Sequence, residues 1–245
     1  TGLEPAQLIP LATAGTLPAQ RKAVATLVQD PSPAAIDALI PFVAVSDVPL
    51  QVTVIARLGE VPVEAAVPAL ANLQRNADPK VRRATLEALS RMPFDDARPP
   101  LEAFLEDNVA TLRIDAAKVL GKRRDPQSVL ALTAHVRDPH KEVRRALLEA
   151  LDQIGDDVAA GGVAQFTRDS ELELQQAAVA SLARIGSPMA IGFLGELFNH
   201  PAAPVRQEAI RILRDVGWLN PVLSARHLAM FVHDPVSELQ AMAID

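Results

Sequence analysis

The apolar residues of this chain follow a helical spacing in almost every segment. In the stretch from Asp138 to Gly155, apolar side chains recur three or four positions apart, which is typical of one face of an amphipathic α-helix. They are Val143, Leu147, Leu148, Leu151 and Ile154. The pattern predicts a helix over 140–153, with its polar face open to solvent or to a partner.

The same pattern returns every 31 residues. An apolar residue followed by a polar one marks each copy: Ala19-Gln20, Leu50-Gln51, Val81-Arg82, Leu112-Arg113, Val143-Arg144, Leu174-Gln175, Val205-Arg206 and, three residues late, Leu239-Gln240. Two further series, which start at Leu8 and Leu11, keep the same step and carry mostly Leu and Phe. Three series in phase identify a repeat protein.

Each repeat contains two predicted helices. The first helix carries the Leu and Phe series, and the second carries the apolar–polar pair. Gly155, Gly186 and Gly217 follow second helices where a left-handed cap favours a residue without Cβ. Asp-Pro pairs such as Asp78-Pro79 and Asp138-Pro139 are predicted to start second helices, since Asp caps a helix and Pro fits its first turn.

These elements predict an all-α fold, an α-α superhelix of stacked helical hairpins. No linker interrupts the pattern, so we expect a single solenoid over 1–245 with about seven and a half repeats. The predicted helices cover 4–12, 17–28, 33–43, 48–58, 63–74, 79–91, 95–106, 109–120, 126–137, 140–153, 157–168, 171–184, 188–199, 202–215, 221–232 and a last fragment from 236.

The pattern D-P-x-V-R-x-x-A-x-x-A-L-x-x-I-G resembles the HEAT repeat, in the short bacterial form first named from phycobilisome lyases. The resemblance rests on Asp78 to Arg82, Asp138 to Gly155 and Val205 to Gly217. It implies a right-handed superhelix whose second helices line a concave surface. It also implies an Asp–Arg ladder between neighbouring repeats. Asp78/Arg82, Asp107/Arg113 and Asp138/Arg144 match the ladder, Asp169/Gln175 and Asp234/Gln240 keep only the Asp, and we expect Arg144 to pair with Asp138.

Polar positions on the second helices lie outside the apolar stripe and are predicted to face the concave side. The candidate partner-binding residues are Arg83, Glu87, Arg91, Arg145, Glu149, Gln176, Arg184, Gln207 and Arg211. One interpretation is a groove that grips an extended partner of mixed charge. The other is a solvated face held by ion pairs four residues apart, such as Arg83–Glu87 and Arg145–Glu149.

Few other residues suggest a site. Trp218 is a possible partner-binding anchor or a filler of the gap opened by the three-residue insertion near it. The five histidines have no spacing that would place two metal ligands on one helix face, so no metal site is predicted. His135 occupies a slot of the Leu and Phe series and is expected in the core or at its rim. No catalytic constellation is present, and no cofactor is predicted.

Composition narrows the function further. The net charge of −6 disfavours nucleic acid as the main partner, because phosphate binding needs a basic surface. The absence of Cys excludes thiolate chemistry. No apolar run approaches the roughly 20 residues that span a bilayer, so membrane insertion is not expected. Cytoplasmic localisation is slightly favoured, and a periplasmic one fits the sequence as well.

The leading hypothesis is a non-enzymatic scaffold that binds another protein through the concave face or the solenoid ends. The resemblance suggests an alternative, a bilin lyase or isomerase-like subunit, and a nucleic-acid-binding HEAT-like module is the second alternative. The chain starts at Thr1 and stops inside the eighth second helix. We therefore expect it to be part of a longer chain or a subunit of a larger assembly.

Overall fold

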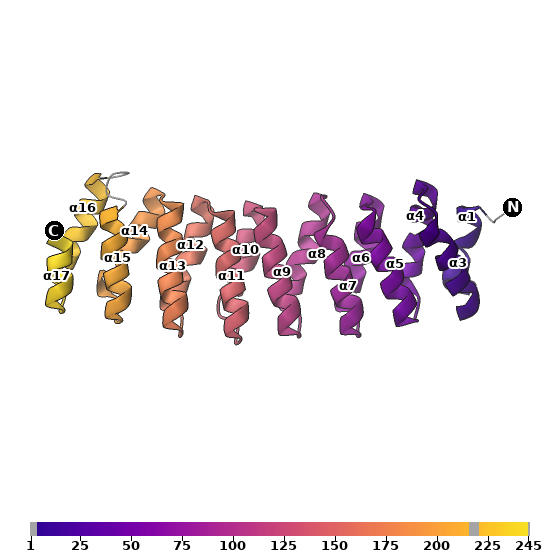
Figure 1. Cartoon of the computed structure of the whole chain (residues 1–245), viewed down its shortest axis with the longest axis horizontal. Helices are drawn as coiled ribbons and strands as arrows, with labels where there is room; N and C mark the ends of the chain where they lie inside the picture. The colour runs from indigo at the N-terminus through magenta and orange to yellow at the C-terminus, as the bar shows by residue number, and fades with distance from the viewer. Residues whose placement is uncertain (1–3, 216–220, 245) are drawn as a thin grey trace. The chain divides into compact units, whose positions relative to one another are not determined.

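The computed structural model describes residues 4–215 and 221–244, and in these residues the chain is all helical. The chain divides into two compact units, Thr1–Ala116 and Ala117–Asp245, called here the N-terminal and C-terminal units. Within each unit, helical hairpins stack in sequence order (Figure 1). This confirms the predicted all-α solenoid fold, while the single domain over 1–245 stays a prediction.

The N-terminal unit is built from short first helices and longer second helices. First helices are interrupted by 3-10 segments, and several of these breaks lie at or beside a proline, as at Pro41. The elements are α1 (Pro5–Leu8), α2 (Leu11–Ala14), α3 (Leu17–Gln29), α4 (Pro33–Leu39), η1 (Ile40–Ala44), α5 (Val48–Glu60), η2 (Glu64–Ala66), α6 (Val67–Ala71), η3 (Asn72–Arg75), α7 (Pro79–Ser90), η4 (Asp95–Ala97), α8 (Arg98–Ala103) and η5 (Phe104–Glu106). The division between the units falls inside α9 (Ala110–Arg123).

The C-terminal unit repeats the same plan. Its second helices α11, α13, α15 and α17 contact one another in sequence order, and so do the first helices α10, α12, α14 and α16 (Figure 1). The elements are η6 (Pro126–Ser128), α10 (Val129–Ala134), α11 (Lys141–Ile154), α12 (Asp157–Gln165), η7 (Phe166–Arg168), α13 (Leu172–Ile185), α14 (Pro188–Glu196), η8 (Leu197–Asn199), α15 (Ala203–Asp215), α16 (Pro221–Phe231) and α17 (Ser237–Ile244).

The Leu and Phe series of the first helices form the core. Fully or almost fully buried members are Leu8, Leu39, Phe42, Leu70, Leu101, Phe104, Leu132, Val163, Phe166, Leu194 and Phe231. His135 is only half-buried, so it lies at the rim of the core, one of the two places expected for it. Burial of such apolar series against the neighbouring repeat is the main stabilising contribution in a stack of this kind.

Second helices end as the sequence predicts and start partly as it predicts. Gly155 and Gly186 adopt φ values of 66° and 62°, the left-handed region that favours glycine. Gly217 lies outside the described residues. Asp78 caps α7, and its carboxylate accepts a hydrogen bond from the Lys80 N–H.

Asp138 does not cap the helix that follows it. The helix α11 begins at Lys141 with His140 at its cap position, and Asp138 lies in the turn before it. The prediction was wrong because Asp138 stands six residues before Arg144, whereas Asp78 stands only four before Arg82. The two aspartates occupy different positions of the repeat and serve different purposes.

Candidate functional site

The nine candidate partner-binding residues on the second helices are all exposed. They lie on α7 and its C-terminal end (Arg83, Glu87, Arg91), on α11 (Arg145, Glu149), on α13 (Gln176, Arg184) and on α15 (Gln207, Arg211). Their exposure follows from their position opposite the apolar stripe. That they bind a partner stays a prediction.

Several of these arginines are held by ion pairs that link neighbouring repeats. Arg83 Nη1 lies 2.9 Å from Asp115 Oδ2, and Arg145 Nη2 lies 2.7 Å from Glu173 Oε1. The predicted pairs with Glu87 and Glu149, four residues away in the same helix, do not form. In these two cases the longer arginine side chain reaches the adjacent second helix instead.

Two further arginines among the nine candidate residues, called here the second-helix row, also form ion pairs. Arg184 Nη2 lies 2.8 Å from Asp152 Oδ2 of the preceding second helix. Arg211 pairs inside its own helix, with Glu208 at 2.5 Å and Asp215 at 2.9 Å. The Arg211 guanidinium holds the pKa of the Glu208 carboxyl below its usual value.

The other members of the row make no side-chain hydrogen bond or ion pair with any described residue. They are Glu87, Arg91, Glu149, Gln176 and Gln207. Because these side chains are exposed, a partner can contact them without first breaking an existing contact. The row therefore combines fixed charges with unpaired polar groups.

A second set of polar contacts is buried between repeats and forms a ladder. In each complete rung the guanidinium of one second helix binds, through two parallel hydrogen bonds, the carboxylate that precedes the next second helix. The Nε and Nη2 distances are 2.7 and 3.1 Å for Arg82–Asp107, 2.7 and 3.0 Å for Arg144–Asp169, and 2.6 and 3.0 Å for Arg206–Asp234. These aspartate side chains are at most 4% exposed.

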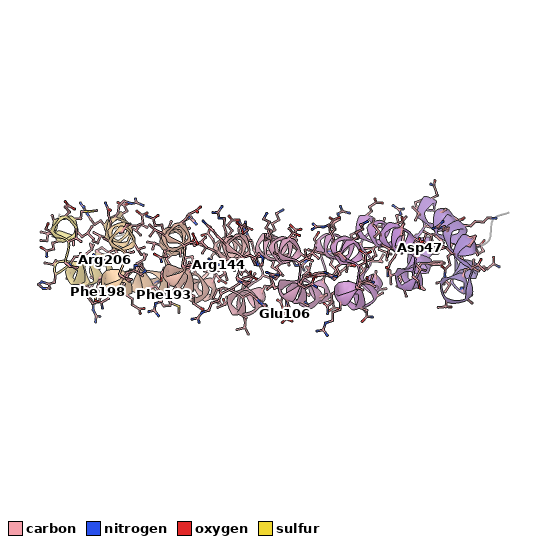
Figure 2. All side chains as sticks on the ribbon, turned by 90° about the horizontal axis from the view of Figure 1, so that it is seen from below. Asp47, Glu106, Arg144, Phe193, Phe198 and Arg206 are labelled. Atoms are coloured by element: carbon pink, nitrogen blue, oxygen red, sulfur yellow. The ribbon has the colours of Figure 1, made fainter. Side chains whose placement is uncertain are left out.

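The structure corrects the expected pairing of Arg144 with the Asp138 carboxylate. Arg144 donates from Nη1 to the backbone carbonyl of Asp138 at 2.9 Å, and its carboxylate partner is Asp169 of the following repeat. Asp169 also accepts a hydrogen bond from the Glu171 N–H at 2.9 Å, so the same carboxylate shapes the turn before α13. Figure 2 marks Arg144 and Arg206 between the two layers of helices in the C-terminal unit.

In the two complete rungs of the C-terminal unit, the pKa of one partner is shifted towards its charged form. Hydrogen bonds from the Arg206 guanidinium lower the pKa of Asp234, and the hydrogen bond to Asp169 raises the pKa of Arg144. Both shifts mean that folding is linked to keeping these groups ionised. Charge pairing therefore favours the ionised forms of Arg144 and Asp234.

One rung of the C-terminal unit lacks the ion pair. Gln175 stands where the other rungs have arginine, and His200 stands where they have aspartate. Gln175 Nε2 donates to the Asp169 carbonyl at 2.6 Å, as an arginine would, but the side chain is too short to reach the next repeat. Its Oε1 atom is buried and has no hydrogen-bond partner among the described residues.

His200 closes this rung without a charge. Its Nδ1 accepts the Ala202 N–H at 3.2 Å, the same turn contact that the aspartates make. Its Nε2 lies 2.8 Å from the Thr167 carbonyl oxygen of the preceding repeat. Because a carbonyl oxygen only accepts, Nε2 carries the proton, and the neutral Nε2–H tautomer satisfies both contacts.

An open cavity of about 910 Å³ lies at this rung. Arg144 and Asp169 border it from the complete rung before, and Gln175 and His200 border it from the incomplete one. A cavity of about 360 Å³ lies at the Arg82–Asp107 rung of the N-terminal unit, and its lining corresponds to the part of the larger cavity beside Arg144 and Asp169. A volume near 900 Å³ is within the range of ligand-binding pockets.

The sequence contains a signal for this arrangement that spacing within one repeat does not reveal. In each of these rungs the second helix contributes either arginine or glutamine, and its partner position lies 25 to 28 residues later. Where the first residue is arginine the partner position holds aspartate, and where it is glutamine the partner position holds another residue. The pairs are Gln51 with Asn76, Arg82 with Asp107, Arg144 with Asp169, Gln175 with His200, and Arg206 with Asp234. Comparing consecutive repeats would have located the incomplete rung.

Trp218, the remaining candidate anchor, lies outside the described residues, and its role stays a prediction. Across residues 4–215 and 221–244 no group of three or more His, Asp or Glu residues is placed to hold a metal ion. In the same part of the chain no helix has the length and apolar content needed to cross a membrane.

Comparison with known proteins gives the family. No curated protein sequence matches the chain. Among solved structures, an engineered protein is 20% identical, with 75% of this chain and 96% of that one covered and a TM-score of 0.47. The complex of CpcE and CpcF of phycocyanin lyase from Nostoc sp. PCC7120 is 20% identical over 94% of each chain, with a TM-score of 0.46. Human deoxyhypusine hydroxylase, in complex with glycerol, is 18% identical over 98% and 93%, with a TM-score of 0.41.

The family whose model matches the sequence is described as HEAT repeats. It matches residues 36–121, 110–161 and 162–245, which is most of the chain. The chain belongs to the HEAT-repeat family.

Proposed function

We propose that this chain is a non-enzymatic scaffold that binds another protein through the exposed row on its second helices. The observation that carries the proposal is the set of exposed, unpaired polar residues on successive second helices: Glu87 and Arg91 in the N-terminal unit, and Glu149, Gln176 and Gln207 in the C-terminal unit. They recur with the repeat, as contacts to an extended partner would.

The charges of the row favour a protein over a nucleic acid. Arg83, Arg145 and Arg184 each lie within 2.9 Å of a carboxylate oxygen, so their charges are already matched. Phosphate binding depends on unmatched cations whose counterions are released. A row of alternating, balanced charges instead suits the mixed polar surface of a protein partner, where complementarity gives specificity more than affinity.

The test compares partner capture by variants of two exposed faces. Glu149→Arg combined with Gln207→Glu changes the row on the second helices of the C-terminal unit. The control, Gln127→Arg combined with Arg226→Gln, changes the net charge of the chain by an amount of similar size (0 against +1) at exposed residues of the first-helix layer. Each immobilised protein is incubated with lysate of the native source, and retained proteins are quantified by mass spectrometry.

We expect at least one protein to be retained equally by the wild type and the control and about tenfold less by the Glu149/Gln207 variant. Equal retention by all three proteins would contradict binding through the second-helix row. Loss in the control alone would move the binding surface to the first helices.

A further inference from the structure

The first helices α14 and α16 of the C-terminal unit pack against each other through a close contact at Gly195 (Figure 1). A Cβ atom at this position would overlap the imidazole ring of His227 on α16, so the ring lies directly against the α14 backbone. Gly59 makes a comparable contact between second helices, but its neighbour there is the small apolar residue Ala88. At Gly195 the neighbour is a titratable side chain.

The polar atoms at this contact have no hydrogen-bond partner among the described residues. Both ring nitrogens of His227 are buried, and so is the hydroxyl oxygen of Ser224, which lies one turn earlier on the same helix. A neutral imidazole carries one N–H donor and one acceptor nitrogen, so either tautomer leaves both groups unsatisfied. Buried polar groups without partners weaken the contact that contains them.

The C-terminal end of α16 is attached more firmly. Phe231 is fully buried, and its ring meets the Phe198 ring edge to face at a centroid distance of 6.4 Å. Shortly after it, the Asp234 carboxylate binds the Arg206 guanidinium of α15 in a complete rung. The attachment of α16 is therefore uneven, because apolar and ionic contacts hold its end while unsatisfied polar atoms lie at its middle.

Few charged groups act on His227 from the helices packed around it. Burial lowers the pKa of His227, and the Arg226 guanidinium on its own helix lowers it further, whereas the Glu196 carboxylate at the end of α14 opposes both. The other helices packed against α16 are α15 and α17. Their charged residues do not contribute to this shift; they are Arg206, Glu208, Arg211, Arg214, Asp215 and Glu238.

The docked position of α16 therefore depends on a neutral imidazole. If α16 leaves α14, the pKa of His227 returns to its ordinary value of 6.5, so docking is fully favoured above that pH and weakens as the pH falls below it. The Arg206–Asp234 rung keeps its full strength down to the ordinary aspartate pKa of 3.8. Between about pH 6.5 and about pH 4, acid weakens the middle of α16 but not its anchored end.

We propose that His227 makes the contact between α14 and α16 a pH-sensitive switch. On gaining a proton, the ring leaves the surface of Gly195 for solvent and for the Glu196 carboxylate, and the middle of α16 separates from α14. Phe231 and the Arg206–Asp234 rung keep the end of α16 and the turn into α17 attached. Mild acid thus opens the stack between α14 and α16 without unfolding the unit.

Hydrogen–deuterium exchange followed by mass spectrometry tests the switch on the intact chain. Peptides that cover α16 are compared with peptides that cover α13 at about pH 7.5 and about pH 5, after correction for intrinsic exchange rates. We expect the protection of α16 to fall about tenfold in acid, while that of α13 changes less than about twofold.

Variants assign the response to His227. His227→Leu removes the titrating group and keeps a side chain that covers Gly195, so the protection of α16 should become almost independent of pH. The matched control is His233→Gln, at the exposed histidine that follows α16, and it should respond as the wild type does. Gly195→Ala displaces the ring from the other side of the contact. In this variant α16 should be weakly protected already at about pH 7.5 and should respond less to acid.

The proposal is overturned if α16 of the wild type stays protected at about pH 5, or if His227→Leu loses protection as the wild type does. Wild-type behaviour of Gly195→Ala at both pH values would also contradict it. Equal loss in α13 would point instead to His200, whose ring contacts the turn before α13. None of the residues of the switch belongs to the second-helix row, so a failure here leaves the proposed function standing.

Discussion

Two neighbouring rungs of the C-terminal unit connect successive repeats through different polar contacts. The Arg144–Asp169 rung uses a buried ion pair with hydrogen bonds of 2.7 and 3.0 Å. One repeat later, Gln175 and His200 each form hydrogen bonds with backbone groups and form no ion pair with each other. The helices of both repeats nevertheless stack in the same order.

The difference shows which interactions determine the stack and which adjust it. The apolar series continues through both rungs, with Leu132, Val163 and Leu194 each fully buried. Repeat stacking therefore does not need the ion pair. The two rungs differ in how their polar groups are paired, and both border the same open cavity.

The largest expected effect comes from breaking a complete rung. Asp169→Ala would leave the Arg144 guanidinium buried without its carboxylate. We expect the free energy of unfolding to fall by about 3–5 kcal/mol, since the remaining charge is desolvated and unpaired. Guanidinium chloride unfolding followed by circular dichroism measures the loss.

Glu149→Ala is the matched control for this variant, because Glu149 is exposed on α11 and has no partner among the described residues. Its effect should stay within about 0.5 kcal/mol. A loss below about 1 kcal/mol for Asp169→Ala would show that the complete rung contributes little more than the incomplete one.

The next effect comes from converting the incomplete rung into a complete one. Gln175→Arg alone places a cation opposite His200, and His200→Asp alone places an anion opposite Gln175. Each single variant should be destabilised, and the double variant should recover about 2 kcal/mol of the summed loss, because the new charges pair. A double-mutant cycle of unfolding free energies measures the coupling. Strictly additive losses would indicate that the two side chains cannot reach each other.

Acid should weaken the Arg206–Asp234 rung. The Arg206 guanidinium lowers the pKa of Asp234, so their ion pair contributes its full stability above the ordinary aspartate pKa of 3.8. That contribution is lost as the pH falls below this value and through the lowered pKa of the folded state. We expect the thermal midpoint to fall with pH below about 4.

Asp234→Asn provides the control for the acid limb, because it removes the titrating carboxyl while keeping a side chain of similar size. The variant should be less stable at neutral pH, and its thermal midpoint should depend less on pH in the acid range. An unchanged acid limb in this variant would assign the pH dependence to other carboxyl groups.

Much of the fold could be predicted from the sequence because one physical signal controls it. The helical spacing of apolar residues and its 31-residue recurrence locate the helices, and α13 at Leu172–Ile185 lies within one residue of the prediction at each end. The predicted range 140–153 lies within one residue of α11 at each end, but its cap was misassigned because an Asp-Pro pair has the same local chemistry in a turn as at a helix cap. Only the distance to Arg144 distinguishes Asp138 from a capping aspartate such as Asp78.

The polar contacts were harder to predict because they connect different repeats. Spacing within a helix suggests Glu149 as the partner of Arg145, yet the offset between adjacent helices brings Glu173 within 2.7 Å. The same limit applies to Arg144, whose partner lies 25 residues later. The cavity was not predicted, because its lining combines residues of consecutive repeats.

The smallest expected effect tests Gln175 itself against its counterpart one repeat earlier. Gln175→Leu removes the hydrogen bond to the Asp169 carbonyl and also removes an acceptor that has no partner. The two changes oppose each other, so we expect a net loss of about 1 kcal/mol or less. Arg144→Leu, the equivalent change in the complete rung, should cost about 3–5 kcal/mol because it leaves the Asp169 carboxylate buried and unpaired.

Unfolding by guanidinium chloride under identical conditions compares the two variants. Similar losses in both would mean that the glutamine is as tightly integrated as the arginine, and that the open cavity has no effect on how the rung responds to substitution.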